Sequence, residues 1–111
     1  MIEVIKAKVG EEELLAQLAE EAIELAHAAL KLRRVIGGKN PTPVRLSEAH
    51  ANMVEEIGDV KLCLRVLGYH TDDPGYDIAG ERKLARWAAR LHEAAPNAWD
   101  EKTESGLLEE D

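Results

Sequence analysis

Three glutamates interrupt an otherwise apolar segment in the first quarter of the chain: Leu18-Ala19-Glu20-Glu21-Ala22-Ile23-Glu24-Leu25. Apolar residues recur three and four positions apart around this segment, as on one face of an α-helix: Leu14, Leu18, Leu25, Ala29 and Leu32. Glu21 occupies the position that completes this row. A carboxylate that loses its water without a partner is costly, so Glu21 is expected to be protonated or to face a cation. Since Glu24 lies one turn on, the pattern predicts a long helix whose middle favours a hard metal ion.

Composition limits the classes of protein to which the chain can belong. Its 111 residues are enough for one domain with a modest core, which oligomerisation would help to complete. The 14 basic and 22 acidic residues give a net charge of -8, which argues against nucleic acid polymer as a partner. Cys63 is the single cysteine, so a disulfide framework and a cysteine-based zinc site are excluded. With no apolar run of membrane-spanning length and no signal-peptide pattern, we expect a soluble cytoplasmic protein.

Glycines and prolines divide the first half of the chain. The first main helix is expected from about residue 11 to 35 or 36, between Gly10 and the Gly37-Gly38 pair that favours a helix end. Residues 1–9 fit a short helix better than a strand. Residues 37–45 contain two glycines and two prolines and predict a loop.

Two further helices are expected in the second half of the chain. The second main helix begins after Ser47 as N-cap and runs to Leu67, and the third begins after Asp77 as N-cap and runs to residue 94 or 95. Residues 97–111 are acidic and hold few large apolar side chains, which predicts a flexible tail. We therefore expect an all-α fold: a bundle of three main helices within one domain of residues 1–96.

A second acidic pair accompanies the second helix. The apolar row of this helix is expected at Met53, Ile57, Val60, Leu64 and Leu67, and a parallel row lies on its flank: Asn52, Glu56, Asp59 and Cys63. Two antiparallel helices would bring Glu21 and Glu24 opposite Glu56 and Asp59. Four carboxylates form an all-oxygen ligand set, which suits Mg²⁺ or Mn²⁺ better than zinc or copper.

The two acidic motifs carry a family resemblance. Glu20-Glu21-Ala22-Ile23-Glu24 followed by Glu56-Ile57-Gly58-Asp59 resembles the signature of the MazG-like all-α nucleoside triphosphate pyrophosphohydrolases. The segment Lys83-Leu84-Ala85-Arg86-Trp87 is similar to the basic and aromatic helix of that family, and the resemblance spans roughly residues 9 to 91. The chain departs from the family in its longer gap between the two motifs, and the excess falls in the loop of residues 37–45.

The resemblance implies an activity and an assembly. The expected reaction is the Mg²⁺-dependent hydrolysis of a nucleoside or deoxynucleoside triphosphate to the monophosphate and pyrophosphate, as in nucleotide pool house-cleaning, with Mn²⁺ as a possible substitute. The implied metal ligands are Glu21, Glu24, Glu56 and Asp59, and Glu20 corresponds to a residue outside the metal's ligands that positions the attacking water. Glu20 and Glu21 are thus the expected catalytic residues. The family further implies a homodimer or homotetramer in which two subunits build each four-helix unit.

Basic residues are expected to contact the phosphates of the substrate. Lys83 and Arg86 lie three positions apart on one helix face and would bind the part that leaves as pyrophosphate. An equally weighted interpretation leaves them to neutralise nearby acids or to remain in solvent. Lys31 and Arg34 belong to a segment, Lys31 to Arg34, that also agrees with the family resemblance, and they are expected chiefly to complement the negative end of the first helix dipole as surface charges.

Two other classes of protein stay open. Glu24 and His27 form the Glu-x-x-His motif of di-iron carboxylate bundles, although Asp59 stands where a second histidine would be needed, unless a second copy of the chain supplies it. A redox bundle is therefore the second enzyme hypothesis. An acidic helical oligomerisation module without catalysis is the hypothesis that involves no enzyme.

Overall fold

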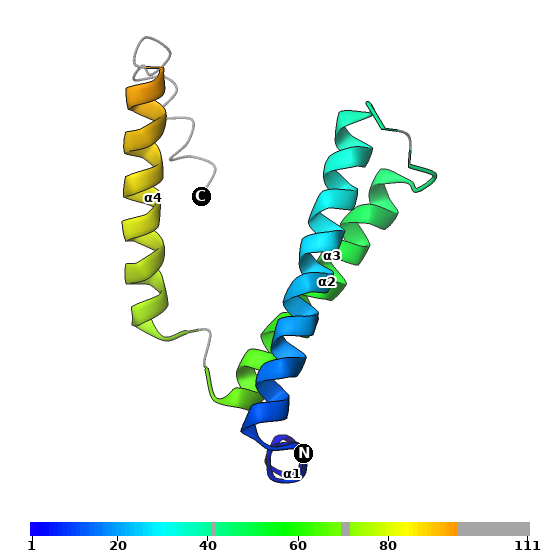
Figure 1. Ribbon diagram of the computed structural model, residues 1–111, viewed down its shortest axis with the longest axis vertical. Coiled ribbons are helices and arrows are strands. Elements are labelled where there is room, and N and C mark those ends of the chain that lie inside the picture. The colour runs from blue at the N-terminus through cyan, green and yellow to red at the C-terminus, as the bar shows by residue number, and fades with distance from the viewer. Residues whose placement is uncertain (41, 70–71, 96–111) are drawn as a thin grey trace. The chain divides into compact units, whose positions relative to one another are not determined.

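All regular secondary structure in the described residues, 1–40, 42–69 and 72–95, is helical in the computed structural model (Figure 1). This part of the chain contains four helices in succession: α1 (Ile2–Val9), α2 (Glu11–Gly37), α3 (Leu46–Leu67) and α4 (Pro74–Ala94). The predicted all-α class is confirmed. Contacts divide the chain into two compact units, Met1–Thr71 and Asp72–Asp111. The predicted acidic tail of residues 97–111 lies outside the described part of the chain, and the domain bounds of 1–96 stay a prediction.

The ends of α2 follow from glycines and charge. Gly10, at φ 87°, separates α1 from α2 in a backbone conformation that other residues rarely adopt. Glu11, Glu12 and Glu13 fill the first turn, where the helix dipole favours negative charge. At the other end Gly38 adopts the left-handed conformation, and its N–H donates to the carbonyl of Arg34. The helix predicted for residues 1–9 and the long helix after it are both present.

Two predicted helix starts are wrong. Ser47 lies inside α3, which begins at Leu46 after Arg45 and has no side-chain cap. In α4 the N-cap is Asp73, whose carboxylate accepts a 2.7 Å hydrogen bond from the N–H of Gly75, so the helix begins three residues before Asp77. Pro74 explains this earlier start, because its fixed φ suits the first helical position and it needs no N–H partner there.

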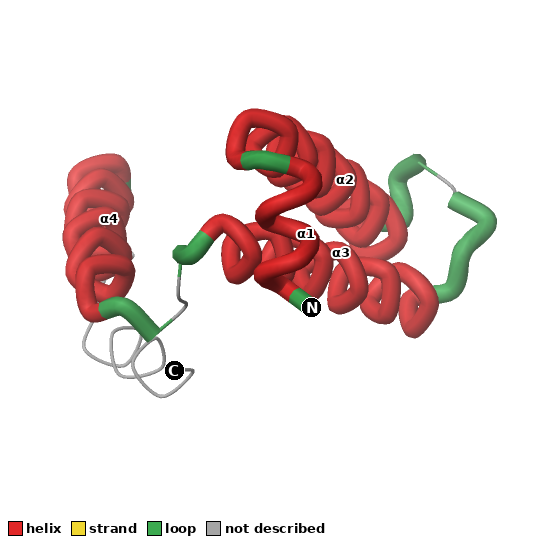
Figure 2. Tube along the Cα trace, turned by 90° about the horizontal axis from the view of Figure 1, so that it is seen from below, coloured by secondary structure: helices red, strands yellow, loops and turns green. Residues whose placement is uncertain are grey.

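Helices α2 and α3 pack side by side as an antiparallel pair, and α1 contacts both of them (Figures 1 and 2). Within residues 1–40, 42–69 and 72–95, four apolar residues are buried: Leu14 and Ala28 on α2, and Ala49 and Val66 on α3. In α2 the expected Ala29 is exposed and Ala28 is buried instead. In α3 the expected Ile57 is 40% exposed, while the row that includes Asn52, Glu56, Asp59 and Cys63 is half-buried.

Large apolar side chains remain exposed on both long helices of the first unit. Leu15, Ile23 and Leu30 of α2 are about half exposed, and Val54 of α3 is 69% exposed. Two paired helices have a single shared interface, so the pairing of α2 with α3 does not cover their other faces. None of the helices in the described ranges carries an apolar stretch that could cross a lipid bilayer.

Candidate metal centre

Glu21, Glu56 and Asp59 form a compact group that we call the carboxylate cluster. Each offers one oxygen atom, and the three oxygens lie within 4.8 Å of one another. Helix α2 supplies Glu21, and α3 supplies Glu56 and Asp59, which are three residues apart and therefore share a helix face. All three residues are half-buried. The structure thus brings together three of the four residues predicted as metal ligands.

Glu56 is the member of the cluster whose carboxylate is in the least favourable environment for a negative charge. Its Oε2 atom is buried and has no hydrogen-bond partner among the described residues. Burial raises the pKa of Glu56 above its ordinary value, and neighbouring negative charges raise it further: Asp59, Glu24, Glu21 and Glu55. A buried acceptor without a partner costs free energy, and a bound cation would remove that cost for a carboxylate in this position.

Glu21 is held from within its own helix. The side-chain amide Nε2 of Gln17 donates a 2.9 Å hydrogen bond to Oε1 of Glu21. An ionised carboxylate has lone pairs on both oxygens, so this bond leaves Glu21 able to ligate a cation. Gln17 is therefore a positioning residue for the cluster that the sequence patterns did not indicate.

The remaining predicted carboxylates lie nearby on α2. Glu24 is exposed and is not one of the three residues whose oxygens converge. It does line a pocket together with Glu56, and its charge contributes to the raised pKa of that residue. Glu20 is exposed on α2. A metal ion that drew Glu24 inward would complete the predicted set of four.

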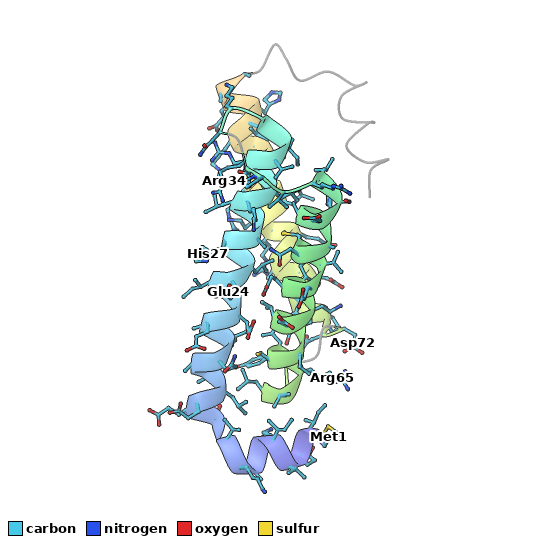
Figure 3. The ribbon with its side chains drawn as sticks, turned by 90° about the vertical axis from the view of Figure 1, so that its right-hand side faces the viewer. Met1, Glu24, His27, Arg34, Arg65 and Asp72 are labelled. Carbon is cyan, nitrogen blue, oxygen red and sulfur yellow. The ribbon has the colours of Figure 1, made fainter. Side chains whose placement is uncertain are left out.

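A pocket of about 270 Å³ adjoins the cluster, and we call it the polar pocket. Its wall consists of side chains from both long helices: Glu24, His27, Ala28, Lys31 and Arg34 of α2, with Asn52 and Glu56 of α3. Figure 3 shows Glu24, His27 and Arg34 in succession along α2. The pocket therefore passes from carboxylates at one end to two cations at the other.

Lys31 and Arg34 have a structural environment that differs from the one predicted from the sequence. The sequence predicts chiefly a dipole-complementing surface role for Lys31 and Arg34, and the structure places both in the wall of the same pocket as Glu56. A signal was present, because Lys31 lies seven residues after Glu24 and Arg34 three residues further, which keeps all three on one helix face. Lys83 and Arg86, the predicted substrate contacts, lie on α4 in the second unit, and their role stays a prediction.

Cys63 and His27 are two further side chains near the cluster that are able to bind a metal ion. Burial raises the pKa of the Cys63 thiol, and the charges of Glu21 and Asp59 raise it further, so the thiol is protonated at neutral pH. His27 is exposed and lines the polar pocket, but it is not one of the converging residues. The converging donors are therefore carboxylate oxygens alone.

An all-oxygen set of this kind suits Mg²⁺ or Mn²⁺. Such an ion can bind phosphate oxygens and lower the pKa of a bound water molecule. The polar pocket beside the cluster has two cations in its wall, Lys31 and Arg34. Comparison with protein-family models, with curated proteins and with solved structures finds no match to the chain.

Proposed function

We propose that the chain is a Mg²⁺-dependent nucleoside triphosphate pyrophosphohydrolase of the MazG-like kind, which cleaves a ribo- or deoxyribonucleoside triphosphate to the monophosphate and pyrophosphate. One observation carries this proposal. The two acidic motifs, far apart in sequence, contribute Glu21, Glu56 and Asp59 to one cluster, and a buried oxygen of Glu56 has no partner there among the described residues. A divalent cation would supply that partner.

The residues of the cluster have distinct roles in the proposed reaction. Glu21, Glu56 and Asp59 would hold Mg²⁺, with Glu24 as the fourth ligand one turn further along α2. When bound, the ion would neutralise charge on the phosphate oxygens and lower the pKa of the water that attacks the α-phosphorus. Glu20, beside Glu21, positions that water. The bond from the α-phosphorus to the bridging oxygen then breaks, and pyrophosphate leaves.

The proposed active form is a homodimer or a homotetramer. Support comes from the uncovered apolar side chains of α2 and α3, which a second pair of helices would bury. A four-helix unit built by two subunits is the simplest arrangement that covers these faces. Light scattering at micromolar concentration tests this assembly, and a monomer would contradict it.

A panel of nucleoside and deoxynucleoside triphosphates, with and without Mg²⁺, tests the activity. We expect monophosphate and pyrophosphate from at least one substrate, and only when the metal is present. Release of diphosphate and inorganic phosphate would place the attack at the terminal phosphorus and contradict the proposal. Iron and visible colour in the purified protein would favour a redox bundle, and failure to bind Mg²⁺ or Mn²⁺ would favour an oligomerisation module.

A further inference from the structure

The polar pocket joins a cation-rich end to the carboxylate cluster inside one unit of the chain. Glu56 belongs to both the cluster and the pocket wall, and Lys31 and Arg34 lie further along the same wall. At a rise of about 1.5 Å per residue, the Cα atoms of Lys31 and Arg34 lie roughly 10 and 15 Å beyond that of Glu24 along α2. Helical side chains lean toward the N-terminus of their helix, so both cations extend back toward Glu24.

Lys31 differs from the other basic residues of the described ranges. It is half-buried, whereas every other lysine and arginine there is exposed. Partial burial of a lysine covers its aliphatic stem and leaves the ammonium group accessible, so Lys31 is held with its charge at the pocket wall. A cation held in this position can contact an anion bound in the pocket.

We propose that Lys31 and Arg34 bind the β- and γ-phosphates of the substrate and retain them as pyrophosphate after cleavage. This inference rests on the proposed hydrolase function and assigns the pyrophosphate contacts to α2. The bound ion neutralises only part of the charge of this group, and the remaining phosphate oxygens accept hydrogen bonds from the Lys31 ammonium and the Arg34 guanidinium. The side-chain amide of Asn52 is a further donor in the same wall.

The size of the pocket favours a fragment over a whole nucleotide. Its volume of about 270 Å³ is just below the range of roughly 300–1,000 Å³ that is usual for sites of drug-sized ligands. A pyrophosphate group requires less space than a nucleoside. At the end of the pocket that Lys31 and Arg34 line, the anionic half of the substrate is the occupant that also matches the charge of the wall.

The decisive experiment compares three single-site variants that each remove one positive charge from α2: Lys31→Met, Arg34→Met and Arg33→Met. Arg33 is the matched control, because it is a neighbouring arginine that does not line the polar pocket. The affinity of each full-length protein for pyrophosphate is measured by calorimetry in Mg²⁺, and the affinity for Mn²⁺ and for the product monophosphate is measured in parallel.

We expect Lys31→Met and Arg34→Met each to weaken pyrophosphate binding about tenfold, the effect of one charge-assisted hydrogen bond. Arg33→Met should change it by less than about twofold, since Arg33 does not line the polar pocket and its charge reaches the bound group only through screened solvent. The affinities for Mn²⁺ and monophosphate should stay within about twofold in all three variants. Lys31→Arg, which keeps the charge, should restore most of the binding and also shows that the site tolerates substitution.

Failures of the inference and of the proposed function give different results. Hydrolysis by the parent together with unchanged pyrophosphate binding in both pocket variants would overturn the inference and leave the function standing. Loss of monophosphate affinity instead of pyrophosphate affinity would place the nucleoside in the pocket and also overturn the inference. If the parent hydrolyses no nucleotide, yet binds pyrophosphate in a way that depends on Mg²⁺ and Lys31, the phosphoanion site stands and the hydrolase function falls.

Discussion

The two ends of the α2–α3 pair differ in the side chains through which the helices meet. Near α1 the helices meet through apolar side chains, with Leu14 and Val66 almost fully buried beside Leu62 and Cys63. Farther along α2 the helices meet through carboxylates, and the polar pocket follows. The first end supplies hydrophobic stabilisation, whereas the second crowds like charges together in a half-buried site. Metal binding is the condition under which the second end would also stabilise the fold.

The largest effect is expected from removing a charge at the carboxylate end. Glu56→Gln keeps the shape of the side chain while it removes one of the charges proposed to hold the ion. We expect kcat/KM at saturating Mg²⁺ to fall about a thousandfold, because the metal stabilises the charge that develops in the transition state. Steady-state kinetics on the preferred nucleotide measures this loss.

Glu55→Gln is the matched control for this change. Glu55 is the neighbouring carboxylate on α3, is exposed, and does not belong to the cluster. It should retain kcat/KM within about threefold of the parent, as surface substitutions usually have small effects. Equal losses in the two variants would show that activity depends on the net charge of the surface and not on a metal centre.

The apolar end should respond through stability alone. Leu14 is 6% exposed, so Leu14→Ala creates a cavity and is expected to lower the free energy of unfolding by about 2–3 kcal/mol. Urea denaturation measures this loss, and the affinity for Mn²⁺ should not change. A loss below about 1 kcal/mol would mean that this end contributes little to the core.

Leu15→Ala is the matched comparison for the loss of stability expected from Leu14→Ala. Leu15 is adjacent in sequence but 47% exposed in the single chain. In a monomer its removal should cost less than half of the Leu14 effect. A cost comparable to that of Leu14→Ala would show that this face of α2 is covered in solution, and light scattering then tells whether a second copy of the chain is present.

A substitution at Glu21 is expected to stabilise the metal-free protein, in contrast to the loss of stability expected for Leu14→Ala, and by a smaller amount. Without metal the carboxylates of the cluster repel one another, so Glu21→Gln should raise the free energy of unfolding in chelator by about 1 kcal/mol, or roughly 4 °C in Tm. The variant should also gain less Tm than the parent when Mg²⁺ is added. Thermal melts with and without Mg²⁺ decide the matter, and equal metal-dependent shifts in the two proteins would exclude Glu21 as a ligand.

The smallest effect is a pH dependence of stability in chelator. In the folded chain the pKa of Glu56 lies above its ordinary value of 4.5, so the folded state binds this proton more tightly than the unfolded state. The stability that results is fully present at low pH and is lost as the pH rises from 4.5 through the raised pKa. The Tm of the parent should therefore fall relative to that of Glu56→Gln over this interval. A constant difference between the two proteins would contradict the raised pKa.

Much of the fold was predictable because its signals are local. Gly10 and Gly38 mark the ends of α2, and the long apolar periodicity predicts both paired helices. The register of their contact was less accessible, because Ala28 and Ala29 are equally apolar and only tertiary packing selects one. The same packing turned the row of Asn52 and Glu56 toward the half-buried side and left Ile57 exposed.

The candidate site shows the same division between motif and packing. The motifs predicted that Glu21 would meet Glu56 and Asp59, and the structure places them together. The pocket that follows depends on which face of α2 turns toward α3, so the positions of Lys31 and Asn52 in its wall could not be derived from spacing alone. The start of α4 was missed for a local reason, since Asp73 and Asp77 are both competent caps and Pro74 decides between them.

The two buried alanines of the α2–α3 pair have a consequence for the ion selectivity of the proposed metal centre. Ala28 and Ala49 are 2% and 1% exposed, so both small side chains lie where the two helices pack against each other. The separation of packed helices depends on the size of the residues at their contact, and the separation of the carboxylates follows from it. Mg²⁺ requires oxygens at about 2.0–2.1 Å, whereas Ca²⁺ accepts about 2.3–2.6 Å. Discrimination between the two ions would therefore depend on the smallest side chains between the helices as much as on the carboxylates themselves.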